Sequence, residues 1–329
     1  MIIAEAGVNH NGCVDIARKL IDIAIWSGAD FIKFQTFTAN QCIIPGTEKA
    51  DYQKINTINT DSQYDMLKAL ELTRHEHKLL FDYCKGKIGF LSTAFDVESL
   101  RFLIDLGVKI IKIASGEIDN LPFLRCVAKF NYPTILSTGM SDLKDVESAI
   151  DVLLASGLSK EKLIVLHCTT NYPTQPNQVN LRAMQTISNK FGVKVGYSDH
   201  TLGIEIPIAA ASLNACVIEK HFTLDRTLLG PDHAASLEPE ELKAMVSSIR
   251  KIELALGDGV KCPVAIELKN KLIARRSIVA IKNIKAGEIF SENNISTKRP
   301  GTGISPMLWD DVIGRTASRD FVANELIKL

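Results

Sequence analysis

The chain has 329 residues, of which 46% are hydrophobic, and its formal net charge is +0, which argues against nucleic acid as the main partner. No apolar run approaches the roughly 18 residues of a membrane span, so we expect no membrane partner. The seven cysteines are scattered without a CxxC pair, which indicates reduced thiols in a cytoplasmic protein.

Short apolar runs alternate with helical patterns along most of the chain. A short apolar run bounded by polar residues is typical of a buried strand. The first run follows Met1 without the basic region and cleavage site of a signal peptide. We expect eight strands, at residues 2–8, 31–35, 88–92, 109–114, 134–136, 162–166, 193–197 and 215–218. Helical spacing predicts helices between them, at 14–25, 62–72, 74–85, 97–106, 122–130, 181–191 and 204–214, and one after them at 239–256.

This alternation over roughly 250 residues predicts an α/β fold, a (β/α)8 TIM barrel. A doubly wound open sheet is the alternative. Polar residues recur at nearly every predicted strand end, and in a barrel those ends converge on one mouth. In an open sheet only the ends near the switch point would meet. The sequence has neither a Walker phosphate loop nor a GxGxxG motif, and we favour the barrel.

A long polar segment separates the second and third predicted strands, at residues 36–65. Loops longer than about 15 residues are usually functional or disordered. We interpret this segment as a lid or substrate loop.

The chain changes in kind after Gly257-Asp258-Gly259. We expect a barrel domain at residues 1–260, a linker at 261–276 and a small second domain at 277–329. In the second domain, residues 277–280 have a strand pattern and residues 298–303 form a basic, glycine-rich loop. A domain of about 50 residues is small enough to need packing on a neighbour.

Two histidines follow the last two predicted strands, in Ser198-Asp199-His200-Thr201 and Glu219-Lys220-His221-Phe222. We expect each histidine to stand just past its strand. Two imidazoles on the ends of neighbouring strands can hold one divalent metal and leave room for a substrate oxygen. The alternative is two unrelated histidines, each satisfied by a backbone hydrogen bond.

Two lysines lie within predicted strands. Lys33 shares a strand face with Gln35, and Lys112 lies on the fourth strand. A buried lysine needs a partner, and an anionic ligand is one. Hydroxyl groups from five strand ends would join the two cations at a phosphate or carboxylate: Thr93, Ser115, Ser137, Thr170 and Ser198. Glu5, Glu117 and Asp232 supply carboxylates for proton transfer or for sugar hydroxyls.

Many ordered motifs resemble those of one enzyme family. They read EAGVNHNG at 5–12, KFQ at 33–35, SGE at 115–117, LSTGM at 136–140, HCT at 167–169, YP at 172–173, SDHT at 198–201, EKHF at 219–222 and GPD at 230–232. Together they resemble the sialic acid (nonulosonic acid) synthase family, which includes N-acetylneuraminate and N,N'-diacetyllegionaminate synthases. The tail, with KRPG at 298–301, resembles the C-terminal antifreeze-like (SAF) domain of that family.

The resemblance implies a transferase that condenses phosphoenolpyruvate with the open-chain aldehyde of an N-acetylated hexose, giving a nine-carbon 2-keto acid and phosphate. In such enzymes a divalent metal holds the aldehyde oxygen while C3 of phosphoenolpyruvate attacks, and water adds at C2 before phosphate leaves. Carried over motif by motif, phosphoenolpyruvate is held by Lys33, Thr93, Lys112, Ser115, Ser137, Thr170 and Ser198, the sugar by Gln35, Tyr172 and Asp232, and the metal by His200 and His221, while Glu5 and Glu117 handle protons and water. The expected metal is manganese, with magnesium or cobalt as alternatives. Arg299 is expected to reach the acetamido group of the sugar in the partner subunit of a domain-swapped homodimer.

Some residues depart from the family pattern. Relatives commonly have Pro at the position of Ala94, and several have Asn at that of Thr170. The N-acetylneuraminate branch has His at the position of Phe34. Phe34, with Tyr52-Gln53-Lys54, resembles the legionaminic acid synthases, whose acceptor is 2,4-diacetamido-2,4,6-trideoxymannose. An aromatic wall at Phe34 would suit this less polar sugar better than N-acetylmannosamine.

Three other functions remain open from the sequence. The first is another phosphoenolpyruvate-dependent synthase of seven- or eight-carbon 2-keto sugar acids, which would lack the antifreeze-like tail. The second is a Schiff-base aldolase with Lys112 as nucleophile, which would need no metal. The third is a non-catalytic glycan-binding protein, which would leave the buried lysines and the paired histidines without a purpose.

Overall fold

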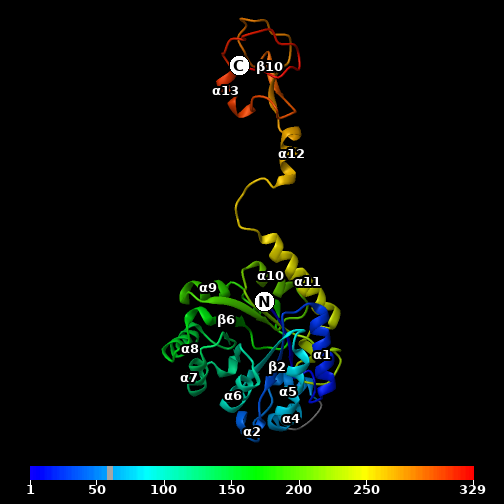
Figure 1. Cartoon of the computed structure of the whole chain (residues 1–329), viewed down its shortest axis with the longest axis vertical. Helices are drawn as coiled ribbons and strands as arrows, with labels where there is room; N and C mark the ends of the chain where they lie inside the picture. The colour runs from blue at the N-terminus through cyan, green and yellow to red at the C-terminus, as the bar shows by residue number, and fades with distance from the viewer. Residues whose placement is uncertain (58–61) are drawn as a thin grey trace. The chain divides into compact units, whose positions relative to one another are not determined.

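The computed structural model describes residues 1–57 and 62–329, which form two compact units, Met1–Gly257 and Asp258–Leu329 (Figure 1). In the first unit eight strands close into a barrel in chain order, and the last strand pairs in parallel with the first. The predicted TIM barrel is therefore confirmed, and the doubly wound open sheet is wrong.

The strands of the barrel lie close to the predicted positions, with one shift. They are β1 (Ile2–Gly7), β2 (Phe31–Thr36), β3 (Gly89–Ala94), β4 (Ile111–Ile113), β5 (Thr134–Ser137), β6 (Leu163–Cys168), β7 (Lys194–Asp199) and β8 (Ile218–His221). The prediction that both histidines stand past their strands holds for His200 and is wrong for His221, the last residue of β8. β8 extends this far because His221 remains in register with Glu5 of β1.

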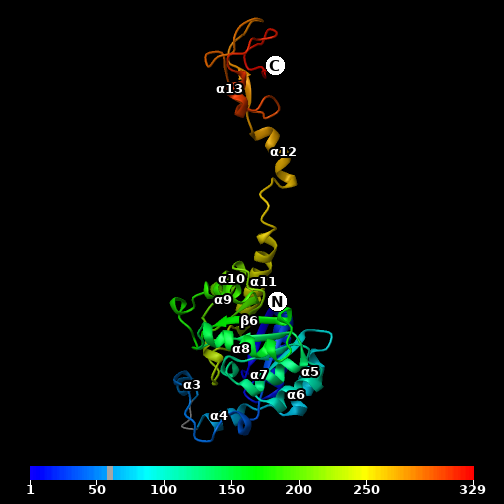
Figure 2. The same cartoon turned by 90° about the vertical axis from the view of Figure 1, so that its left-hand side faces the viewer.

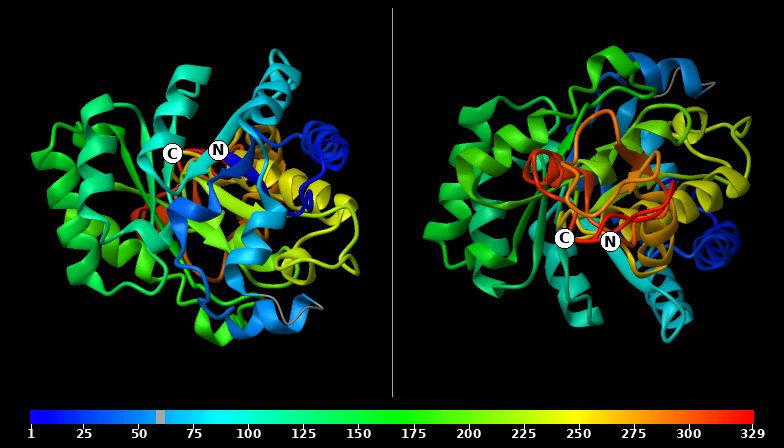
Figure 3. Two further views of the ribbon diagram at one scale, coloured as in Figure 1. Left: turned by 90° about the horizontal axis from the view of Figure 1, so that it is seen from below. Right: turned by 90° about the horizontal axis from the view of Figure 1, so that it is seen from above.

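Helices surround the barrel, as Figure 3 shows. They are α1 (Val14–Ser27), α4 (Gln63–Leu70), α5 (Arg74–Cys84), α6 (Val97–Leu106), α7 (Leu121–Phe130), α8 (Leu143–Ala155), α9 (Ala183–Phe191), α10 (Glu205–Ser212) and α11 (Pro239–Leu256). The core lies between barrel and helices: Leu20 and Ile21 of α1 are fully buried in one cluster with Ile32 of β2. α1 ends at Gly28, whose φ of 81° is the left-handed conformation that glycine adopts without strain.

The predicted lid, residues 36–65, contains two short helices, α2 (Ala39–Cys42) and α3 (Asp51–Asn56); residues 58–61 of that prediction lie outside the described residues. α2, α3 and α4 gather at one end of the barrel (Figures 1 and 2). Asn56 connects α3 to the segment after β8: its side-chain amide donates a hydrogen bond of 3.0 Å to the carbonyl oxygen of Pro231. Its own carbonyl oxygen accepts from the backbone N–H of Gly230 at 3.3 Å.

The second unit has its own small core. β9 (Ser277–Ala280), at the predicted strand position, pairs antiparallel with β10 (Ile295–Lys298), and α13 (Trp309–Val312) follows. Ile278, Phe290 and Phe321 are among its buried side chains. Residues 261–276, predicted as a linker, contain α12 (Ala265–Ala274), none of whose side chains is buried. Among the described helices of the chain, none has the length and apolar character to span a membrane.

Candidate active site at the mouth of the barrel

One cavity in the barrel unit collects nearly all of the predicted site residues. Its lining includes Glu5, Lys33, Gln35, Thr93, Lys112, Ser115, Ser137, Thr170, Tyr172, Ser198, His200, His221 and Asp232. These residues come from the carboxyl ends of the barrel strands or from the loops that follow them. Active sites of (β/α)8 barrels lie at this face, so the fold brings together what the sequence scatters over more than 200 residues.

Two predicted site residues do not line this cavity. Glu117 lies in a short 3-10 helix, Ser115–Glu117, and its carboxylate accepts a hydrogen bond of 2.6 Å from the Asn120 side chain. Its role in proton transfer stays a prediction that this conformation does not support. Arg299 is exposed in the second unit, and its place in a partner's site stays a prediction.

The lysines and carboxylates of the cavity form a buried ionic cluster. The Lys33 ammonium lies 2.8 Å from a Glu5 carboxylate oxygen and 3.7 Å from one of Glu219. It also donates to the Thr93 hydroxyl at 3.1 Å. The Lys112 ammonium donates to the Ser137 hydroxyl at 2.6 Å and lies 3.8 Å from Glu219. These contacts with hydroxyl and carboxylate groups hold both ammonium groups in the same cavity.

Burial and charge pairing set the protonation states in this cluster. Burial alone would lower the pKa of Lys33, but Glu219 and Glu5 outweigh it and raise that pKa. For Lys112, burial prevails over the attraction of Glu219 and lowers the pKa. Burial raises the pKa of Glu5 to about 7, although Lys33 opposes the shift. Glu5 can therefore take up or release a proton near neutral pH.

Glu219 is the residue that the sequence reasoning missed. It is buried between the two lysines and accepts a hydrogen bond from the Ser198 hydroxyl at 2.9 Å. Burial alone would raise the pKa of Glu219, but Lys112 and Lys33 outweigh it and lower that pKa, so the group is an anion. The signal was present: Glu219 stands two residues before His221, so both side chains face the same side of β8.

The two histidines lie together, with ring centroids 5.5 Å apart. Nδ1 of His200 lies 2.6 Å from the carbonyl oxygen of Thr169. A carbonyl oxygen can only accept, so Nδ1 carries the proton and Nε2 is left with a free lone pair. Nδ1 of His221 is buried without a hydrogen-bond partner, 3.8 Å from Asp232. The alternative reading, a backbone bond for each histidine, thus holds only for His200.

This pair fits a divalent metal. Burial lowers the pKa of both histidines, which keeps both rings neutral as metal ligands must be. The hydrogen bond that His200 donates from its other ring nitrogen is the support that metal-bound histidines usually have. Within residues 1–57 and 62–329 no set of three or more His, Cys, Asp and Glu side chains forms a metal cluster, so the two histidines would leave most of the coordination shell to water and substrate.

Comparison with known proteins identifies the family of this chain. The profile of the NeuB family matches residues 20–261, and that of the SAF domain matches residues 275–329. The chain belongs to the NeuB family. It is 53% identical to the N,N'-diacetyllegionaminic acid synthase of Campylobacter jejuni over 100% of this chain and 98% of that protein. Its identity to the N,N'-diacetyllegionaminic acid synthase of Legionella pneumophila is 48%, over 98% of this chain and 91% of that one.

A solved structure of this family has the same fold. It is the N-acetylneuraminic acid synthetase of Leptospira borgpetersenii in complex with citrate, which is 36% identical and superimposes with a TM-score of 0.71 over 82% of this chain and 89% of that one. The resemblance to the sialic acid synthase family, with its SAF domain, is therefore confirmed.

The predicted aromatic wall at Phe34 is wrong for this NeuB-family chain. Lys33 and Gln35 face the cavity, so Phe34 between them points to the opposite side of β2. Its ring is fully buried in the core and stacks on Phe90, with centroids 5.7 Å apart. Aromatic rings that do line the cavity include Tyr172 and Tyr52 of α3. The ring centroid of Tyr172 lies 4.1 Å from that of His200, and the Tyr52 ring stacks on Tyr172 with centroids 5.0 Å apart.

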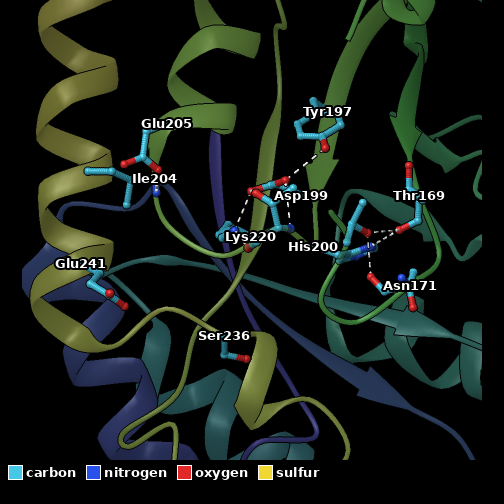
Figure 4. A network of polar contacts seen from close by, with 12 residues as sticks. Thr169, Asn171, Tyr197, Asp199, His200, Ile204, Glu205, Lys220, Ser236 and Glu241 are labelled. Carbon is cyan, nitrogen blue, oxygen red and sulfur yellow. Dashed lines mark hydrogen bonds and ion pairs between the residues drawn. The ribbon is translucent and has the colours of Figure 1, made fainter. Parts of the chain in front are cut away.

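A second ionic pair in this NeuB-family barrel lies between β7 and β8 (Figure 4). Its two residues, Asp199 and Lys220, alternate along the chain with side chains that line the cavity, so the pair faces the other side of the sheet. Asp199 and Lys220 are both fully buried, with carboxylate and ammonium 2.5 Å apart. The Tyr197 hydroxyl donates to Asp199 at 3.0 Å, and the Thr201 hydroxyl does so at 2.9 Å. Lys220 also donates to the carbonyl oxygen of Thr201. Since Asp199 precedes His200 and Lys220 precedes His221, this network ties together the two strand ends that carry the histidines.

Proposed function

We propose that this protein is a N,N'-diacetyllegionaminic acid synthase, which condenses phosphoenolpyruvate with 2,4-diacetamido-2,4,6-trideoxymannose and releases phosphate. The observation that carries the proposal is the single cavity in which two buried lysines face a pair of neutral histidines. The high identity to two synthases of that name supports the choice of acceptor. N-acetylmannosamine, which would give N-acetylneuraminic acid, is the alternative acceptor.

The lysine side of the cavity would hold the anionic substrate. Lys33 and Lys112 supply two buried positive charges. Charge-assisted hydrogen bonds from such ammonium groups to a phosphate or carboxylate are strong. Hydroxyls for the remaining oxygens come from Thr93, Ser115, Ser137, Thr170 and Ser198. Glu219 would keep both ammonium groups oriented before the substrate binds.

The histidine side would hold a divalent metal, for which manganese is the proposed ion. When bound, such a metal supplies a Lewis acid that polarises the carbonyl of the acceptor. His200 and His221 would be its protein ligands. Gln35, Tyr172 and Asp232 line the same cavity and would bind the hydroxyl and acetamido groups of the sugar.

Glu5 stands between the two sides and would move protons. It lies in register with Lys33 on one neighbouring strand and with His221 on the other. After C3 of phosphoenolpyruvate bonds to the aldehyde carbon, C2 is electron-poor and water adds there. Glu5, with a pKa of about 7, can accept the proton that this water loses. Cleavage of the C–O bond then releases phosphate and leaves the 2-keto acid.

The second unit would complete the site across a homodimer. The SAF segment carries Arg299 on an exposed loop after β10. A guanidinium group there could bind the carbonyl oxygen of an acetamido group in a partner's barrel. We propose a domain-swapped dimer on this ground.

The direct test is phosphate release from phosphoenolpyruvate with each of the two sugars, in the presence of manganese. We expect turnover with both and a higher specificity constant for the 2,4-diacetamido sugar. EDTA should abolish turnover, manganese should restore it, and His221→Ala should remain inactive with the metal present. Undiminished turnover after exhaustive chelation would refute the metal, and a higher specificity constant for N-acetylmannosamine would refute the acceptor.

A trapping experiment distinguishes the Schiff-base mechanism from the proposed one. An aldolase that uses Lys112 would form a covalent adduct when pyruvate and borohydride are added together. Our proposal predicts no change in mass under these conditions. An adduct at Lys112 would support the aldolase instead.

A further inference from the structure

We propose that an apolar wall of this cavity selects acceptor sugars that carry a methyl group at C6 instead of a hydroxymethyl group. The wall consists of Val8, Met66, Leu67, Leu70 and Phe95. This inference rests on the proposed function and assigns specificity to residues outside the barrel strands.

The cavity has two chemically different sides. Most of the charged and hydroxyl-bearing side chains come from the strands and the loops that follow them, and α3 adds the polar side chains of Tyr52 and Gln53. The wall comes from segments outside the strands: Val8 follows β1, Phe95 follows β3, and the other three residues lie on α4. Met66, Leu67 and Leu70 share one face of α4, since residues three and four apart are neighbours on a helix.

The wall is held in a fixed position before any ligand binds. Val8, Met66 and Leu70 are buried in a small core of their own with Phe37, whose ring meets that of Phe95 edge to face at 6.0 Å. α4 begins at Ser62, whose hydroxyl accepts from the backbone N–H of Asp65. Just beyond α4, Glu71 accepts a hydrogen bond of 2.5 Å from the backbone N–H of Ala39. A wall built in this way cannot easily turn a polar group toward a ligand.

The chemistry of the proposed reaction fixes which end of the sugar meets this wall. The aldehyde carbon, C1, must lie between the lysines and the histidines, because the new bond forms there. C6 is at the other end of the open chain, so it lies away from the reacting groups on the strands, on the side of the cavity that the wall forms. A methyl group gains from contact with apolar side chains, whereas a hydroxyl group pressed against the wall would lose its water without finding a hydrogen-bond partner among the five side chains of the wall.

Two acceptors that differ only at C6 test the wall. They are 2,4-diacetamido-2,4,6-trideoxymannose and 2,4-diacetamido-2,4-dideoxymannose. A difference of this kind in an apolar pocket is worth about 10- to 200-fold in kcat/KM, and we expect at least tenfold in favour of the 6-deoxy sugar. Leu67→Asn, and separately Met66→Gln, should reduce that ratio several-fold in the full-length protein, with the KM for phosphoenolpyruvate unchanged.

The ratio is the readout because a variant that only disturbs folding lowers the rate with both sugars alike. Leu213→Asn is the matched control: Leu213 is 47% exposed after α10 and does not line this cavity, so the ratio should stay at its wild-type value. Equal use of both sugars by the wild type, or an unchanged ratio in both wall variants, would overturn the assignment and leave the proposed function standing. If phosphate is released with neither sugar, the proposed function is overturned, and the inference with it.

Discussion

Lys220→Met tests whether the buried ionic pair behind the two histidines depends on both of its charges. The ammonium of Lys220 lies 2.5 Å from Asp199, and neither side chain has any exposed surface. The substitution preserves most of the side-chain volume but leaves the Asp199 carboxylate buried with only the hydroxyls of Tyr197 and Thr201 and the backbone N–H of Thr201 as donors. Removing one partner of a buried pair costs about 3–5 kcal/mol, and we expect a loss of this size in the free energy of unfolding.

Urea unfolding followed by circular dichroism would measure this loss. The double variant Asp199→Leu/Lys220→Met removes both charges and should recover most of the stability, because replacing a whole buried pair is often neutral. Lys78→Met removes an exposed ion pair with Asp82 on α5 and should leave the unfolding midpoint unchanged. The reasoning is refuted if Lys220→Met unfolds at the wild-type urea concentration, or if the double variant is as unstable as the single one.

Three further predictions concern the reaction. Lys112→Ala should lower kcat/KM for phosphoenolpyruvate by an amount equivalent to about 2–4 kcal/mol of activation free energy, because one charge-assisted contact to the anion is lost. Lys109→Ala, at an exposed neighbouring position, is the control. An unchanged kcat/KM in Lys112→Ala would exclude the contact. The rate should fall as the pH drops through about 7, since protonated Glu5 cannot accept a proton; Glu5→Gln should be slow and lack this decline, and a persisting decline would assign it to another group. Mixing inactive Arg299→Ala and His221→Ala after subunit exchange should restore up to about a quarter of the sites in a swapped dimer, whereas a mixture that stays inactive despite proven exchange would place Arg299 outside the partner's site.

The sequence by itself determined the barrel and most of its active face. Apolar runs alternate with amphipathic helices at regular intervals, and eight parallel strands joined by helices have few ways to close. Once the barrel is assumed, polar residues at strand ends must share one mouth, which is why the sequence alone places Lys33, Lys112, His200 and His221 there. The period of two along a strand also determines that Lys33 and Gln35 face the same way, and it should have excluded Phe34 from the cavity.

Only the tertiary structure decided which charges pair and what α4 contributes to the cavity. Glu219 lies between two lysines that are distant in sequence because β8 closes on β1, and no local pattern specifies that distance. The proton of His200 is on Nδ1 because that nitrogen donates a hydrogen bond to the carbonyl oxygen of Thr169, which lies in a different loop. Met66, Leu67 and Leu70 have the spacing of any amphipathic helix, and a helical pattern states that a face is buried without stating against what. Long-range packing decides whether the apolar face of a helix meets the core or a cavity. The apolar face of α4 meets both.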